Sequence, residues 1–177
     1  MPSTQPIGLL RRTWLSVESR ALRRLAAVAR RRSRLPEHLL TGMDGEREAI
    51  FYLRQQGYTI VARRWRSAKQ RGDLDLVAWH ESTLCFIEIK TRSRRDFVPA
   101  EAAVDDDKQR TLQALARVYM RRLPEASRES PSRFDVLSVY MQRPETNPTA
   151  ATGPTEQSQA HATEPDFVLY QGAFSWK

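Results

Sequence analysis

Apolar and polar positions divide the chain into an N-terminal amphipathic stretch, a central run of helices and strands, and a late return to strand composition. Within residues 1–40, apolar residues recur at spacings of three and four, which predicts a helix. They are Ile7, Leu10, Trp14, Val17, Ala21, Leu25 and Val28. Arginine fills much of the remaining surface, which suits a phosphate clamp, contact with an anionic membrane surface, a targeting peptide or simply a loosely attached basic arm.

The pattern of a folded domain begins at residue 41. We expect a helix from about Asp44 to Gln56, which Gly57 can end in a left-handed conformation. Strands are expected at 58–66, 73–80, 83–91 and 134–141. Between the last two, a helix should begin near residues 105–107 and run to residue 123, where a proline follows. This order of elements predicts an α/β fold.

The chain end should return to this domain after a long polar insertion. Residues 142–165 are rich in Pro, Thr, Gln, Ala and Glu, a composition that predicts a disordered loop. Residues 167–170 have strand composition and should pair beside the strand at 134–141. The expected organisation is therefore an extension at 1–40, a domain at 41–141, a loop at 142–165 and a returning strand at 166–177.

Charge and cysteine content say less than they first suggest. The formal net charge of +8 resides in the extension, where nine arginines between residues 11 and 34 face one acid, Glu18, and leave 20 basic and 20 acidic residues elsewhere. The single cysteine, Cys85, lies in an apolar run and cannot form an internal disulfide. No apolar stretch approaches the ~18 residues of a membrane span. We therefore expect a soluble protein in the reducing cytoplasm.

A candidate site follows from strand alternation and turn arithmetic. Glu88 and Lys90 share one face of their predicted strand, about 6.6 Å apart along the backbone. A hairpin turning about residues 81 and 82 pairs residues whose numbers sum to 163, which places Asp75 opposite Glu88. Two carboxylates this close repel unless one is protonated or a cation lies between them. Oxygen ligands in this number favour Mg²⁺ or Mn²⁺ directed at a substrate phosphate, with Lys90 positioning or deprotonating water or neutralising charge.

These residues resemble those of a known superfamily. An acid followed by Glu-x-Lys on the next strand is similar to the signature of the restriction-endonuclease-like PD-(D/E)XK nucleases. More narrowly, six short motifs resemble the largely uncharacterised YraN family in order and spacing: GMDGEREA at 42–49, GY at 57–58, GDLDL at 72–76, FIEIKTR at 86–92, KQ at 108–109 and RFDV at 133–136. Ala173 and Phe174 are similar to that family's usual ending.

The resemblance implies a mixed central sheet flanked by helices and a nuclease-like activity. It assigns Asp75, Glu88 and Lys90 to the catalytic trio and Glu46 to a supporting acid on the first helix, near the metal. A carboxylate in the first turn of a helix would also be favoured by the helix dipole alone. The chain departs from the family pattern at Asp73, where Glu is usual, and at Arg64, where Asn is usual.

Further residues are candidates for nucleic-acid contact. Arg64, Trp65 and Arg66 form a basic run with one aromatic, which suits phosphate contacts and stacking or, equally, a charged edge strand. Arg92 and Arg94 follow the candidate strand, and Lys108 and Gln109 open a helix that can hold a phosphate or merely be solvated. Asp135 is expected to be a structural partner of an arginine, and the scattered His38, His80 and His161 argue against zinc.

The leading hypothesis is a Mg²⁺- or Mn²⁺-dependent phosphodiesterase that acts on DNA or a branched nucleic acid. A nucleic-acid-binding module that keeps the fold without cleaving is the first alternative. A membrane- or partner-docking protein that works through the basic extension is the second.

Overall fold

The computed structural model describes Glu18, Leu22 and residues 37–92, 104–141 and 165–176. Most of the basic extension, Arg94 and nearly all of the polar insertion lie outside these described residues. The described part contains three helices, α2 (Glu37–Gln55), α3 (Asp106–Met120) and the short α4 (Glu125–Arg128). It also contains β1 (Tyr58–Ser67), β2 (Gln70–His80), β3 (Thr83–Arg92), β4 (Ser132–Tyr140) and β5 (Asp166–Phe174). Among these residues, no helix is both long and apolar enough to cross a bilayer.

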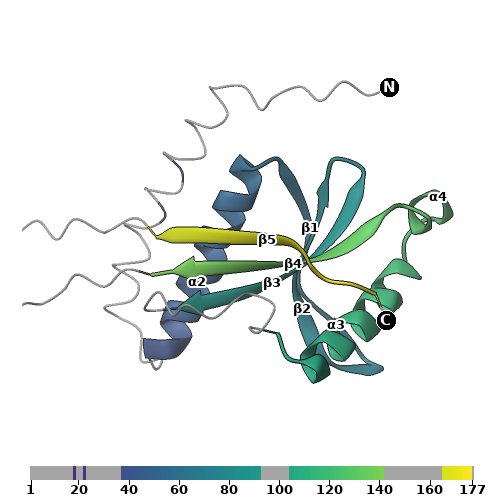
Figure 1. Cartoon of the computed structure of the whole chain (residues 1–177), viewed down its shortest axis with the longest axis horizontal. Coiled ribbons are helices and arrows are strands. Elements are labelled where there is room, and N and C mark those ends of the chain that lie inside the picture. The colour runs from purple at the N-terminus through teal and green to yellow at the C-terminus, as the bar shows by residue number, and fades with distance from the viewer. Residues whose placement is uncertain (1–17, 19–21, 23–36, 93–103, 142–164, 177) are drawn as a thin grey trace, which may run out of the picture.

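The strands form one mixed sheet in the order β1-β2-β3-β4-β5 (Figure 1). β1, β2 and β3 are antiparallel neighbours, β4 runs parallel to β3, and β5 returns antiparallel to β4. The parallel pair requires a crossover, which α3 supplies. The expected α/β fold with a mixed, helix-flanked sheet and a returning terminal strand is confirmed.

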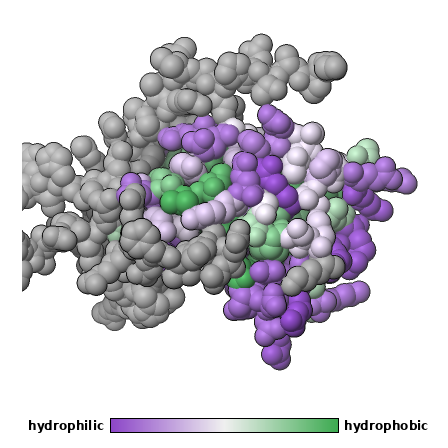
Figure 2. All heavy atoms as spheres, in the orientation of Figure 1, coloured by the Kyte–Doolittle hydropathy of each residue, from purple (hydrophilic) through white to green (hydrophobic). Residues whose placement is uncertain are grey.

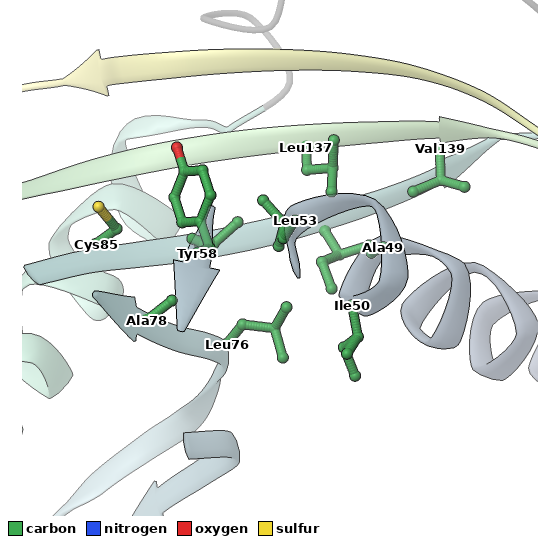
Figure 3. Packing of buried hydrophobic residues seen from close by; sticks show 11 residues of the cluster. Ala49, Ile50, Leu53, Tyr58, Leu76, Ala78, Cys85, Leu137 and Val139 are labelled. Atoms are coloured by element: carbon green, nitrogen blue, oxygen red, sulfur yellow. The ribbon is translucent and has the colours of Figure 1, made fainter. Parts of the chain in front are cut away.

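The two larger helices cover opposite faces of this sheet. Ala49, Ile50 and Leu53 of α2 point toward Leu76, Leu137 and Val139 on the strands (Figure 3). On the other face, Leu112, Leu115 and Ala116 of α3 pack against the side chains of β3 and β4 that face away from α2. β3 is therefore buried on both faces along most of its length, as a central strand between two helical layers should be.

Strand bounds and register follow the sequence closely. Every paired position of β2 and β3, from Leu76 and Ile87 to His80 and Thr83, has residue numbers that sum to 163, as expected from the turn. Asp105 caps α3 by accepting a hydrogen bond from the Lys108 amide at 2.8 Å, which confirms that helix start. The helix ends at Met120, three residues earlier than expected, and α4 was not predicted.

The start predicted for the first helix was wrong. α2 begins at Glu37, so residues 42–45, which look like a helix start in the sequence, lie inside it. Gly45 marks the place where α2 meets β3, since a Cβ at this position would overlap the Thr91 side chain. The glycine thus permits close approach of helix and strand instead of ending the helix. The C-terminal prediction is confirmed, because Gly57 has a φ of 94°.

Candidate functional site

The candidate site lies where β2 and β3 separate. The paired ladder ends at Leu76 and Ile87, one step before Asp75 and Glu88. In place of a backbone–backbone pair at this position, the Asp75 carboxylate accepts a hydrogen bond from the Ile89 amide at 2.9 Å. Leu74 and Leu76 pack into opposite core clusters although regular alternation would put them on one face. The strand therefore turns over at Asp75, which brings its carboxylate beside β3.

Glu88 is the most buried charge of the site. Only 4% of the residue is exposed, and its Oε1 atom lies 3.0 Å from Lys90 Nζ and 3.1 Å from Lys108 Nζ. Its Oε2 atom is also buried but has no hydrogen-bond partner among the described residues. A buried carboxylate oxygen normally accepts hydrogen bonds or binds a cation, so Glu88 Oε2 is a candidate ligand atom for a cation.

The surroundings of the site also shift the pKa of Asp75. Its burial, followed by the negative charge of Glu88, raises the pKa of Asp75 from an ordinary 3.8 to about 6. The hydrogen bond from the Ile89 amide and the positive charge of Lys108 oppose this shift in pKa, and Glu46 adds to it. A bound cation would stabilise two carboxylates that repel each other in this way.

Glu46 approaches the site from α2, but not from the first helical turn as expected. Because α2 begins at Glu37, Glu46 lies in the middle of the helix, where the dipole of the N-terminus has no strong effect. Its Oε1 atom instead accepts a hydrogen bond from Arg64 at 2.7 Å. The helix-dipole interpretation of this acid is therefore wrong, and its partner is a cation from β1.

Lys108 is a site residue whose main contact the sequence did not reveal. It opens α3, as predicted, but its ammonium group joins Lys90 on Glu88. Its neighbour Gln109 donates a hydrogen bond to the Val104 carbonyl at 2.9 Å and so fixes the entry to the helix. The lysine at the start of the later helix could be noticed in the sequence, but its distance from Glu88 depends on the crossover.

The remaining nucleic-acid candidates have different surroundings. Trp65 lies edge-on to Tyr119 at 5.2 Å between ring centroids, with the Arg122 guanidinium 5.1 Å from its ring, so β1 packs on α3 through this side chain. The Arg66 side chain is 75% exposed and lies 3.4 Å from Asp73. Arg92 ends β3 and is partly buried. Nucleic-acid contact by these residues stays a prediction.

On the face seen in Figure 2, strongly hydrophilic residues gather on the side of the molecule where α3 and α4 lie. Polar and charged surface of this kind is compatible with a charged ligand but does not specify one.

A second polar cluster lies on the other face of the sheet, and all of its carboxylate oxygens have hydrogen-bond partners. Asp135 is fully buried and accepts hydrogen bonds from Arg133 Nε at 2.9 Å, the Gly172 amide at 2.9 Å and the Tyr58 hydroxyl at 3.3 Å. Gln171 donates to the same Tyr58 hydroxyl at 2.8 Å. The expectation that Asp135 is a structural partner of an arginine is confirmed, and this cluster anchors β5 to the sheet.

The residues at the β2–β3 separation fit a hard divalent cation. Asp75 and Glu88 supply carboxylate oxygens, one of which is buried and without a partner. No group of three or more His, Cys, Asp or Glu side chains with metal-binding geometry occurs among the described residues. Mg²⁺ is typically held by one or two carboxylates together with waters and substrate phosphates, and this donor set meets that requirement.

Comparison with known proteins agrees with this architecture. Residues 45–139, which contain the whole candidate site, match the model of a family described as "Uncharacterised protein family UPF0102". The chain is 50% identical over 109 residues to the UPF0102 protein Acid345_3985 of Koribacter versatilis. The aligned region covers 62% of this chain and 74% of that protein. It is 45% identical over 117 residues to a UPF0102 protein of Solibacter usitatus. This aligned region covers 66% of this chain and 86% of that protein. The chain therefore belongs to family UPF0102, the YraN family that its motifs resemble.

Proposed function

We propose that this protein is a Mg²⁺- or Mn²⁺-dependent phosphodiesterase that cleaves nucleic acid, with DNA or a branched structure as its substrate. The observation that carries the proposal is Glu88, a buried carboxylate with one oxygen held by two lysines and the other without a partner. Folding does not by itself call for such an arrangement, whereas binding of a cation would complete it.

Asp75 and Glu88 would hold the cation between two adjacent strands. A divalent cation bound there supplies positive charge for the phosphoryl group and increases the acidity of water. The Ile89 amide fixes one oxygen of Asp75, so the carboxylate is already oriented by the backbone of β3. Burial and, after it, repulsion from Glu88 raise the pKa of Asp75 to about 6, and cation binding would relieve the repulsion.

The lysines would act on the substrate. Lys90 Nζ lies on Glu88 Oε1, and 30% of its side chain is exposed, so the ammonium group is held at the edge of the site. From there it can donate a hydrogen bond to a phosphate oxygen or orient the attacking water. Lys108 is similarly placed, 33% exposed, and provides a second positive charge at the start of α3. Glu46 lies beside the site and is paired with Arg64.

A second candidate function is a nucleic-acid-binding module that does not cleave. It is favoured by the two ammonium groups on Glu88, which balance the carboxylates of the site without any cation. In that case Lys90 and Lys108 would bind phosphate groups, and Asp75 and Glu88 would only position the lysines. The cytoplasmic location that Cys85 suggests stays an expectation in both cases.

One experiment separates the two functions. The full chain is incubated with single-stranded, duplex and branched DNA and RNA in Mg²⁺ or Mn²⁺, beside Asp75→Ala, Lys90→Ala and the control Asp107→Asn. Asp107 is a suitable control because it is an acid on α3 whose side chain is 91% exposed. We expect cation-dependent cutting that falls by about 100-fold or more in both site variants and is unchanged in the control. Binding that survives both site substitutions without any cutting would support the module instead.

A further inference from the structure

Arg64 occupies an unusual position beside the candidate site. The register of β1 and β2 pairs Arg63 with Leu76 and Trp65 with Leu74, which places Arg64 opposite Asp75. Arg64 has a φ of 44°, in the left-handed region that a long side chain rarely adopts. Such strained backbone conformations persist only where the surrounding structure requires them. The irregular backbone of β1 thus coincides with the point at which β2 turns over.

The guanidinium group of Arg64 links β1 to α2. Its NH2 atom lies 2.7 Å from Glu46 Oε1. The hydrogen bond and charge of Glu46, with smaller contributions from Asp73 and Asp75, raise the pKa of Arg64. Its positive charge is therefore shared with the acids that surround the site on the side of β1.

From this geometry we propose that Arg64 takes the place of a second divalent cation, so that the site binds one cation, at Asp75 and Glu88. The inference rests on the proposed function and specifies its metal content. Enzymes with two metal ions place the ions about 4 Å apart, and a second hard ion needs oxygen ligands of its own, typically from a further acid. Here the further acid, Glu46, already has a fixed positive partner from the protein itself.

A guanidinium group has consequences that a metal ion does not. It neutralises Glu46 permanently because it does not lose its proton, and it offers only hydrogen-bond donors. It therefore has no position for a water ligand. Activation of water then depends on the single cation position and on Lys90, while Arg64 supplies charge alone.

The number of bound ions tests this inference directly. Metal-free full-length protein is titrated with Mn²⁺, and free Mn²⁺ is counted by electron paramagnetic resonance. We expect one bound ion per wild-type chain and two per Arg64→Asn chain, because removal of the guanidinium leaves Glu46 available to a cation. Asn is chosen because it tolerates positive φ, so the variant should fold at least as well as the wild type.

Matched variants identify the source of any gain. Arg66→Asn removes the same charge two residues away on β1, from a pair with Asp73 at 3.4 Å, and should still bind one ion. Arg64→Asn combined with Glu46→Gln should return to one. In the wild-type background, Glu46→Gln should also leave one ion bound, because Arg64 and not a metal is the partner of Glu46.

Failure of this inference can be told apart from failure of the proposed function. The inference is wrong if Arg64→Asn gains no ion, if Arg66→Asn gains one equally, or if Glu46→Gln alone loses the ion. Two ions on the wild-type chain would also overturn it. Absence of tightly bound Mn²⁺ from the wild-type chain would instead contradict the metal site on which the proposed function depends.

Discussion

Two buried carboxylates on neighbouring strands, Glu88 on β3 and Asp135 on β4, have opposite hydrogen-bond environments. Both oxygens of Asp135 accept hydrogen bonds, from a side-chain cation, a hydroxyl and a backbone amide. Glu88 has two lysines on one oxygen and no partner within the described structure for the other. The difference teaches that burial of a charge does not identify a functional site, whereas an incomplete set of partners around that charge is a useful sign.

The largest effect is expected from a substitution that disrupts the hydrogen-bond cluster around Asp135. Asp135→Ala would remove the carboxylate partner of Arg133, which is partly buried, and the acceptor of the Gly172 amide hydrogen bond. We expect the free energy of unfolding to fall by about 3 kcal/mol or more. Urea denaturation followed by circular dichroism measures this change.

The matched substitution on the other carboxylate sharpens the comparison. Glu88→Gln keeps the shape of the side chain, and its lysine partners are partly exposed to water. We expect its free energy of unfolding to change by only about 1 kcal/mol, because Gln keeps an acceptor oxygen and the partly exposed lysines are not left as buried unpaired charges. A loss as large as that of Asp135→Ala would mean that Glu88 is primarily a structural residue.

An effect smaller than that of Asp135→Ala concerns the pH dependence of stability. Because the pKa of Asp75 is raised to about 6 in the folded protein, folding favours its protonated form. The resulting destabilisation is fully present above about pH 6 and disappears as the pH falls toward the ordinary pKa of 3.8. In cation-free buffer, Asp75→Asn should therefore be more stable than the wild type at pH 8, by on the order of 2 kcal/mol, and equally stable near pH 4. Thermal unfolding across this pH range checks the sign, and a constant difference between the proteins would contradict the assigned cause.

An effect smaller than that of Asp75→Asn is produced by the cation itself. At a Mn²⁺ concentration ten times the dissociation constant, a single site stabilises the folded protein by about 1.4 kcal/mol. The unfolding temperature of the wild type and of Asp107→Asn should rise accordingly, and chelation should reverse the rise. Glu88→Gln should show little or no response. An equal response in Glu88→Gln would place the cation somewhere other than the incomplete cluster.

Much of the site was predictable because it depends on local geometry. The alternation of β3 places Glu88 and Lys90 on one face, and the short turn after His80 fixes the register as far as Leu76 and Ile87. The turn-over of β2 that brings the Asp75 carboxylate beside β3 was not predicted. The N-cap at Asp105 was also readable, since a short acidic side chain before an amphipathic run has a local partner in the next helical turn. The start of α2 was predicted wrongly, because the GMDG segment satisfies the local rules for a helix start. In the structure Gly45 lies inside the helix and allows it to pack closely on Thr91.

The sequence by itself determined the order of elements, the β2–β3 register and the identity of the carboxylates and lysine that converge, because each depends on neighbours only a few residues away. Only the tertiary structure decided that Lys108 reaches Glu88, that Arg64 pairs with Glu46, and that one oxygen of Glu88 is left without a partner. These contacts join different layers of the fold. Their distances are set by how α2 and α3 pack on the sheet, which no local pattern of residues specifies.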